Sequence, residues 1–201
     1  MTISQKLSFL QKIFLESAFV KDAQKGYVVV QNFNLTIDPE ILDLATRCWA
    51  DMYQEHTNVD AVVGLPDAGS RLAPLLAEKL HAKLVLPSKR SVTPPGAWQD
   101  VVTYSNPSFT TNQEDVTSHI GFVKKGTKVL LVDDVIAKGH TAIAAIQALQ
   151  KAGVEVVGLA VLFDKTWQGG KAVVEQTTSI EVCSLISIQS ITADGKILLN
   201  Q

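Results

Sequence analysis

The segment Val129–Ala142, VLLVDDVIAKGHTA, decides the fold of this chain. Its apolar residues lead into two adjacent carboxylates, Asp133 and Asp134, and a short loop with one glycine then joins an alanine-rich run. This order predicts a buried strand over 128–132, then a loop, and then a helix over 141–151. We therefore expect the two acids at one edge of a sheet, beside the N-terminus of a helix.

The chemistry of such an edge follows from its parts. The N-terminus of a helix attracts a phosphate through its backbone N–H groups and the macrodipole. Acids beside a phosphate site need another ligand, such as ribose hydroxyls or a hydrated Mg²⁺ ion. A phosphorylated ribose needs all of these groups at once. The residues alone equally allow a plain helix cap plus a surface acid at Asp133 and Asp134.

Outward from this segment, helical and strand patterns alternate along the chain. Helices are predicted over 4–18, from Asp38-Pro39 to about 54, over 69–80 and over 170–176, and strands over 27–33, 61–64, 83–86, 154–163 and 180–188. Such alternation predicts a parallel sheet with right-handed crossovers. The segment 91–119 is rich in Pro, Ser, Thr and Asn and has no clear period, so we expect a long irregular loop, either a lid or disordered.

Composition excludes several classes of protein. The 201 residues are 46% hydrophobic, enough for a core without disulfide staples, so Cys48 and Cys183 are expected as reduced thiols. A net charge of −2 offers no electrostatic surface for nucleic acid. The chain has no secretory segment and no run of about 18 apolar residues, so we expect a cytoplasmic protein without a membrane partner.

Two more segments follow predicted strands at the same sheet edge. Val63–Arg71, VGLPDAGSR, is a glycine-containing turn into a helix, either an ordinary connection or a nest of backbone N–H groups for a phosphate. Lys89 and Arg90 follow the next strand, as a solvated pair or as charge for an anionic ligand. The functional interpretation requires all three segments to lie together.

The segment around Asp133 resembles the phosphoribosyl-diphosphate (PRPP) signature of the type I phosphoribosyltransferases. That signature is an apolar strand, two acids, two apolar residues and a small-residue loop with glycine and threonine. The residues that match it are Asp133, Asp134, Val135, Ile136, Ala137, Gly139 and Thr141. The chain departs from the signature at Lys138 and His140, where small residues are usual. The resemblance extends over nearly the whole chain.

The resemblance implies a PRPP site made of three parts. Asp133 and Asp134 would act on the ribose hydroxyls as the catalytic acids. The 5′-phosphate would lie on Ala137, Lys138, Gly139, His140 and Thr141, and the diphosphate on Leu65, Pro66, Asp67, Ala68, Gly69, Lys89 and Arg90. The loop near Tyr104 would close over the reacting centre and exclude water. Mg²⁺ would be the cofactor, held mainly by substrate oxygens and water, with Asp133 and Asp134 as its candidate protein ligands.

A second segment of the sequence indicates which kind of nucleobase is bound. Phe163–Gly170, FDKTWQGG, and the segment 32–39 resemble the xanthine phosphoribosyltransferases, which implies that Asn34, Lys165 and Trp167 bind the base. A lysine ammonium only donates hydrogen bonds, so Lys165 favours a 6-oxopurine (xanthine, guanine or hypoxanthine) over adenine. The alternative is an ion pair of Lys165 with Asp164 or another neighbouring carboxylate. Xanthine and guanine are not distinguished.

The expected fold is α/β, a type I phosphoribosyltransferase fold with a mostly parallel twisted sheet, flanking helices and a small N-terminal hood. We expect one domain over 1–201, with a hood and N-terminal segment over 1–40, a core over 41–188 and a tail over 189–201. PRPP and a nucleobase are the expected partners, in purine salvage, and family members are commonly homodimers. Alternatives are an orotate or adenine phosphoribosyltransferase, or a PRPP-sensing regulator without catalysis.

Overall fold

The computed structural model describes residues 1–54, 58–66, 68–89, 101–107, 115–121 and 123–200. Its helices are α1 (Ile3–Ser17), α2 (Pro39–Gln54), α3 (Gly69–Lys79), α4 (His140–Lys151) and α5 (Gly170–Thr178), with a π-helix η1 (Gln31–Leu35) and a 3₁₀ turn η2 (Thr166–Gln168). Its strands are β1 (Ala18–Asp22), β2 (Tyr27–Val30), β3 (Ala61–Gly64), β4 (Lys83–Val85), β5 (Val101–Pro107), β6 (Asp115–Gly121), β7 (Lys128–Ile136), β8 (Glu155–Lys165), β9 (Val182–Ile191) and β10 (Ile197–Leu199).

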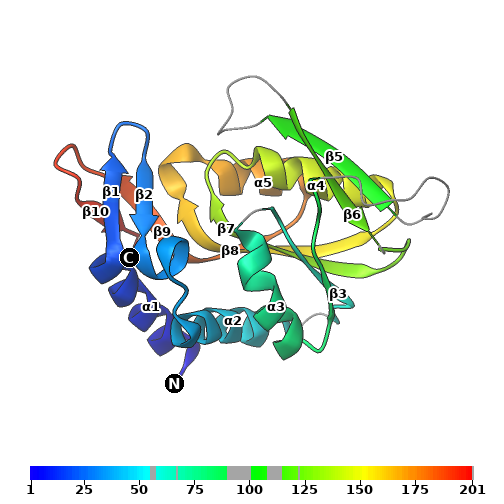
Figure 1. The fold of residues 1–201 in the computed structure, drawn as a ribbon, viewed down its shortest axis with the longest axis horizontal. Coiled ribbons are helices and arrows are strands. Elements are labelled where there is room, and N and C mark those ends of the chain that lie inside the picture. Colours follow the sequence, from blue (N-terminus) through cyan, green and yellow to red (C-terminus); the bar gives the residue numbers. More distant parts are fainter. Residues whose placement is uncertain (55–57, 67, 90–100, 108–114, 122, 201) are drawn as a thin grey trace.

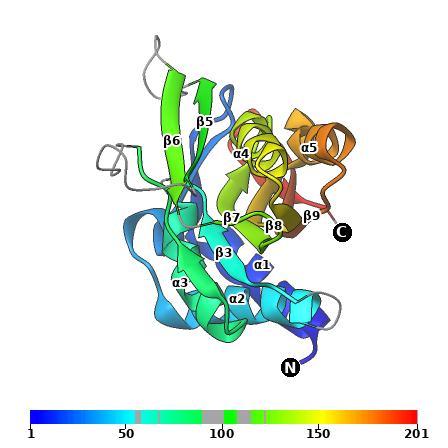
Figure 2. The same cartoon turned by 90° about the vertical axis from the view of Figure 1, so that its right-hand side faces the viewer.

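A six-stranded sheet forms the centre of the molecule, with strand order β10-β9-β8-β7-β3-β4 (Figure 1). All neighbours in it are parallel except β10, which pairs antiparallel with β9 at the edge. Helices α1, α2 and α3 cover one face, and α4 and α5 cover the other (Figures 1 and 2). The predicted α/β class with a mostly parallel sheet is confirmed.

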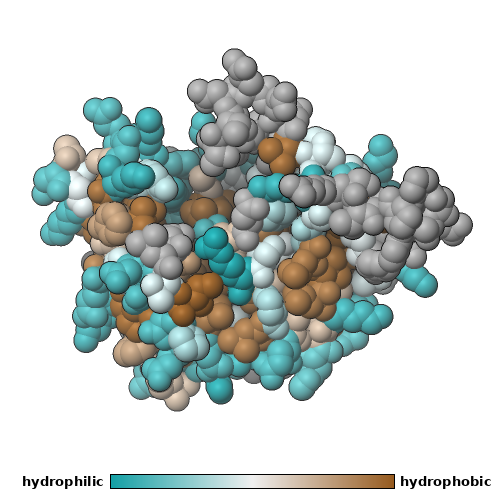
Figure 3. All heavy atoms as spheres, in the orientation of Figure 1, coloured by the Kyte–Doolittle hydropathy of each residue, from teal (hydrophilic) through white to brown (hydrophobic). Residues whose placement is uncertain are grey.

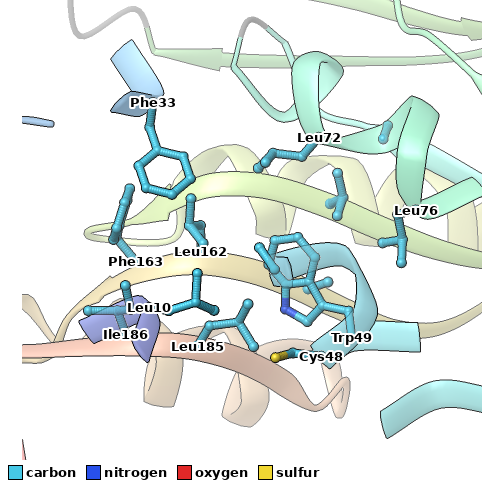
Figure 4. Close-up of a cluster of buried hydrophobic side chains, with 14 of the residues drawn as sticks. Leu10, Phe33, Cys48, Trp49, Leu72, Leu76, Leu162, Phe163, Leu185 and Ile186 are labelled. Carbon is cyan, nitrogen blue, oxygen red and sulfur yellow. The ribbon is translucent and has the colours of Figure 1, made fainter. Parts of the chain in front are cut away.

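Strand β7 is apolar on both faces because helices cover both. Leu130 and Val132 pack with α1, α2 and α3, whereas Val129 and Leu131 pack with α4, and all four are fully buried. Figure 4 shows the first of these layers, where the Trp49 side chain of α2 lies among leucines from the sheet and from α3. A strand buried on both faces is expected for a parallel sheet between helical layers.

Most predicted elements begin and end within a few residues of the observed ones, but some predictions need correction. The strand predicted over 128–132 continues to Ile136, because β8 pairs with it as far as Asp164. The strand predicted over 27–33 ends at Val30, where η1 begins. Strand β1 was not predicted, and it pairs antiparallel with β2 from Ala18 onward. We call β1, β2 and the turn between them, residues 18–30, the hood hairpin.

The irregular loop predicted over 91–119 is wrong where the structure describes it. Strands β5 and β6 form an antiparallel hairpin, outside the central sheet, that packs against α4 (Figure 2). Val102 and Tyr104 are buried, while Thr103 and Ser105 face outward and hydrogen-bond to His119 and Thr117. The alternation of Val102, Thr103, Tyr104 and Ser105 is the period of two of a half-buried strand, but it is short and lies within a segment rich in Pro, Ser, Thr and Asn. Residues 91–100 lie outside the described residues.

The surface of the molecule carries both polar and apolar side chains. On the face shown in Figure 3, apolar patches lie between polar side chains. Phe19 and Tyr27 of the hood hairpin are each about half exposed. Among the described residues, no helix is both long enough and apolar enough to cross a membrane.

Candidate active site

Three connections meet at the carboxyl ends of β3, β7 and β8 (Figure 1). Gly64 at the end of β3 pairs with Val132 of β7, and the Leu65 N–H donates to the Val132 carbonyl at 2.8 Å. This hydrogen bond holds the residue that follows β3 beside Val132, the residue immediately before Asp133. Ligands of open α/β sheets bind at this edge, because the connections there leave a crevice.

The two acids lie within β7 rather than after it. Asp133 pairs with Val161 of β8, and its Oδ1 accepts a hydrogen bond from the Asp134 N–H at 2.9 Å. Burial raises the pKa of the Asp134 carboxyl, while its hydrogen bond with Asp133 and the charge of Arg71 act in the opposite direction. Both side chains are partly exposed, so a ligand at the edge can reach them.

A glycine brings the connection after β3 directly onto the acids. A Cβ at Gly69 would collide with the Val132 carbonyl oxygen and would lie 3.2 Å from Asp133 Oδ1. Helix α3 begins at this glycine, and the Ser70 N–H donates to the Leu65 carbonyl at 3.1 Å to close the turn. The start of α3 therefore lies against Asp133, and Pro66 and Ala68 precede it in the chain, while Asp67 lies outside the described residues.

The connection after β7 is held in the same way. Gly139 has a φ of 80°, in the left-handed region, and it caps the N-terminus of α4. The Gly170 N–H donates to the Ala137 carbonyl at 3.0 Å, and a Cβ at Gly170 would collide with that carbonyl oxygen. The loop over 137–141 is thus held against α5, with Lys138 and His140 exposed and Thr141 partly buried. The positive end of the α4 dipole faces the loop.

A cavity of about 540 Å³ lies between the hood hairpin and the ends of β7, β8 and β9. Its lining includes Phe19, Lys21 and Tyr27 from the hood hairpin and Asp134, Phe163 and Lys165 from the sheet. Burial lowers the pKa of the Lys165 ammonium, and the charge of Asp134 opposes this shift. The cavity therefore places a lysine and one of the two acids around the same space.

Aromatic contacts build the inner wall of this cavity. The ring of Phe163 lies 5.0 Å from that of Phe14 and 5.4 Å from that of Phe33, measured between centroids (Figure 4 shows Phe33 beside Phe163). Phe33 belongs to η1, the element that also contains Asn34. The side chain of Asn34 lies outside what the structure describes.

Trp167 lies in η2, outside the lining of the cavity. A Cβ at Gly26, in the turn of the hood hairpin, would lie 2.8 Å from the Cζ2 atom of Trp167, so the indole packs closely on that turn. The Thr166 hydroxyl donates to the Ile188 carbonyl at 2.9 Å and anchors η2 to β9. The structure thus places Trp167 against the hood hairpin, where it supports the outer wall of the cavity.

The alternative of an ion pair between Lys165 and Asp164 is not supported. Asp164 is only 3% exposed, and its Oδ1 has no hydrogen-bond partner among the described residues. No ion pair joins Lys165 and Asp164, both of which the structure describes. Lys165 instead lines the cavity, and burial raises the pKa of the Asp164 carboxyl.

The chain after β4 joins the β5–β6 hairpin. Ser88 exchanges two backbone hydrogen bonds with His119, at 2.9 and 2.8 Å, and the exposed Lys89 follows. Arg90 lies outside the described residues. Burial, with a contribution from the charge of Asp133, raises the pKa of the Tyr104 phenol to about 12. Tyr104 belongs to the buried cluster that the hairpin shares with α4.

Sequence reasoning missed the cavity residues Phe19, Lys21 and Tyr27 of the hood hairpin, and it included Phe163 only as part of the segment 163–170. The only available signal for the hairpin residues was its β-branched and aromatic character, which indicates a strand but no ligand. In the described part of the chain, no three His, Cys, Asp or Glu side chains cluster in a way that could hold a metal ion.

Comparisons with known proteins agree with this geometry. The family model of the phosphoribosyl transferase domain matches residues 32–190. An adenine phosphoribosyltransferase of Christiangramia forsetii is 34% identical over 152 residues, which cover 76% of this chain and 84% of that protein. A xanthine phosphoribosyltransferase of Bacillus licheniformis is 31% identical over 190 residues, 90% of this chain and 95% of that protein.

Two further comparisons cover similar lengths. A hypoxanthine/guanine phosphoribosyltransferase of Methanobacterium lacus is 29% identical over 187 residues, 91% of this chain and 90% of that protein. The crystal structure of the adenine phosphoribosyltransferase from Rhodothermus marinus has a TM-score of 0.72 at 26% identity and covers 92% of this chain and 99% of that one. The resemblance found in the sequence is confirmed, and this chain belongs to the type I phosphoribosyltransferase family.

Proposed function

We propose that this phosphoribosyltransferase transfers the phosphoribosyl group of PRPP to a 6-oxopurine in purine salvage, with release of diphosphate. One observation carries this proposal: Lys165 and Asp134 line the same cavity, and Asp134 also belongs to the sheet edge where the connections after β3 and β7 meet. A base in the cavity and a ribose phosphate at the edge would therefore be neighbours.

The sheet edge would hold the PRPP. Asp133 and Asp134 accept hydrogen bonds from the ribose hydroxyls, and the loop over 137–141 receives the 5′-phosphate at the N-terminus of α4. The connection 65–69 supplies backbone N–H groups to the diphosphate. Lys89 and Arg90 would add positive charge near the diphosphate from the end of β4.

The reaction is a displacement at the anomeric carbon of the ribose. The base nitrogen attacks as the bond to diphosphate breaks, through a state in which the sugar ring carries positive charge. The protein contributes by holding the nitrogen and the carbon in line, and by stabilising the negative charge of the leaving diphosphate. No covalent bond to the enzyme is required. The partly buried carboxylates of Asp133 and Asp134 would stabilise the positive charge that develops on the sugar ring.

A divalent cation fits the donor set at this edge, where two adjacent carboxylates, Asp133 and Asp134, are partly exposed. Such a site suits Mg²⁺ bound mainly through diphosphate oxygens and water, with these acids as its protein ligands. When bound, the ion would neutralise charge on the diphosphate.

The choice of base depends on Lys165. Its ammonium donates to an oxo group at position 6, and it would face the amino group of adenine without an acceptor. A site that hydrogen-bonds one group can strongly reject an analogue with the opposite polarity. Asn34 would read the other edge of the base, Phe163 would provide aromatic surface, and Trp167 would support the hood hairpin beside the cavity. Adenine is the second candidate, because one relative with 34% identity is an adenine phosphoribosyltransferase.

The test is turnover of radiolabelled PRPP with xanthine, guanine, hypoxanthine, adenine and orotate, for the wild type and for Lys165→Met. We expect the 6-oxopurines to be used in preference, and this preference to shrink in the variant. Preference of the wild type for adenine or orotate would refute the proposal, as would unchanged selectivity in Lys165→Met. A protein that binds PRPP and turns over no base would be a regulator.

The family resemblance also implies a homodimer in the cytoplasm. Light scattering coupled to size-exclusion chromatography would measure the oligomeric state, and cell fractionation would measure the location.

A further inference from the structure

The cavity between the hood hairpin and the ends of β7, β8 and β9 contains a second lysine, which belongs to none of the family motifs. Lys21 of the hood hairpin and Lys165 of β8 both line it, and Asp134 is the one carboxylate among the described lining residues. The lining thus has two ammonium groups against one acid. Because ammonium groups only donate hydrogen bonds, the cavity offers its ligand more donors and positive charge than acceptors.

Lys21 is directed to the cavity by an irregularity of the hood hairpin. Val20 pairs with Val28 and Asp22 pairs with Tyr27, so Lys21 is the extra residue of a β-bulge. A bulge changes the direction in which a side chain points and is a common device next to binding sites. The Lys21 Nζ atom lies 5.2 Å from the centroid of the Tyr27 ring, which lines the same cavity. This cation–π contact holds the ammonium beside another residue of the cavity lining.

The two ammonium groups approach from different walls. Lys165 lies at the end of β8, and Lys21 lies on the hood hairpin, whose turn packs against Trp167. A flat base between these walls would meet one donor from each side. The ligand that complements this pair of donors is a purine with hydrogen-bond acceptors at two separate positions.

We propose that Lys21 is a specificity-determining residue that, together with Lys165, selects a purine with oxo groups at both positions 6 and 2. This inference rests on the proposed function and narrows it to xanthine. Hypoxanthine has no group at position 2 for Lys21 to bind. Guanine carries an amino group there, which would face the ammonium donor to donor.

The experiment measures KM and kcat for xanthine, guanine, hypoxanthine and PRPP in the wild type and in three variants. Lys21→Met removes the charge and keeps much of the chain length, and Lys21→Arg keeps the charge. Lys25→Met is the matched control, because Lys25 lies in the same hairpin, pairs with Asp22 at 3.8 Å and does not line the cavity.

We expect Lys21→Met to raise the KM for xanthine about tenfold, the usual effect of a lost hydrogen bond to a charged group. The KM values for hypoxanthine and PRPP should stay unchanged, Lys21→Arg should recover most of the xanthine affinity, and Lys25→Met should match the wild type. This pattern distinguishes base recognition from loss of structure in the hairpin.

Other outcomes overturn the inference separately from the proposed function. A wild type that uses xanthine and hypoxanthine equally, or a Lys21→Met variant that loses both equally, refutes a role for Lys21 and leaves 6-oxopurine transfer standing. A raised KM for PRPP in Lys21→Met would assign Lys21 to the phosphates instead. A wild type specific for adenine would refute both statements.

Discussion

The sheet edge around Asp133 and the cavity under the hood hairpin are built by different means. At the sheet edge, backbone contacts dominate: the Leu65 N–H binds the Val132 carbonyl, and the Gly170 N–H binds the Ala137 carbonyl. Glycines make these approaches possible, because a Cβ at Gly69 or Gly170 would meet a carbonyl oxygen. In the cavity, by contrast, lysine, tyrosine and phenylalanine side chains form the walls.

This difference suggests how one fold can serve several bases. A site made of backbone is shared by every chain that folds in the same way, and it would suit the part of the substrate that the proposed function keeps constant, the phosphorylated ribose. A site made of side chains changes with single substitutions. The relatives of this chain are accordingly adenine, xanthine and hypoxanthine/guanine phosphoribosyltransferases that share its domain.

The largest expected effect comes from breaking the backbone contact at the sheet edge. Gly69→Ala would place a methyl group against the Val132 carbonyl and beside Asp133, so the connection 65–69 must move. A displacement of about 1 Å at a reacting centre can lower turnover about a hundredfold. We expect that loss in kcat/KM with PRPP. The control is Gly121→Ala, since a Cβ at Gly121 meets none of the described residues within 4 Å, and it should retain activity. Normal turnover in Gly69→Ala would contradict the close fit.

The next largest effect is expected from Asp133 and Asp134, the two acidic side chains at the sheet edge. Asp133→Asn and Asp134→Asn each remove an anionic acceptor, and charge-assisted hydrogen bonds contribute about 1.5–3 kcal/mol, so turnover should fall at least tenfold. Unchanged turnover in both variants would leave the pair a structural cap.

Stability gives Asp134→Asn a second readout. Because burial raises the pKa of Asp134 above its unfolded value, the ionised form destabilises the ligand-free fold. The variant should therefore melt at a higher temperature than the wild type at about pH 7, and this advantage should vanish as the pH falls below the ordinary range of a carboxyl. Thermal melting across this pH range checks the sign.

A smaller effect concerns the support of the hood hairpin. Trp167→Ala removes the indole that packs on Gly26, so the hairpin wall should loosen and the KM for every base should rise about fivefold, while the KM for PRPP stays constant. Hydrogen exchange of β2 should accelerate in the same variant. A raised KM with unchanged exchange would assign Trp167 to direct stacking on the base.

The smallest effect tests whether a side chain adds to the backbone site for the 5′-phosphate. Lys138 is exposed in the loop over 137–141, where a small residue is usual in the family. If its charge binds the phosphate, Lys138→Thr should raise the KM for PRPP about threefold and flatten its dependence on salt. The exposed Lys124, in a distant turn, provides the control as Lys124→Thr. An improved KM would show that Lys138 obstructs the loop.

Local sequence was sufficient for the elements that form the proposed phosphate site. The apolar run before Asp133, the Asp38-Pro39 start of α2 and the alternation of strands and helices predicted the central sheet and its helices. Asp38 indeed caps α2, accepting from the Glu40 N–H at 2.9 Å. These features depend on residues that are neighbours in the chain, because a helix or a buried strand is encoded by periodicity over a few turns or pleats.

Tertiary structure alone decided where β7 ends and which residues line the cavity. Pairing with β8 keeps Asp133 and Asp134 within the strand, and no local pattern encodes that pairing. The cavity joins Lys21, Asp134 and Lys165, which are far apart in the sequence and meet only because the hood hairpin folds over the ends of the strands. The close approaches at Gly69 and Gly170 likewise exist only in the packed molecule. A sequence states which groups are present, whereas the distance between remote groups depends on how the layers pack.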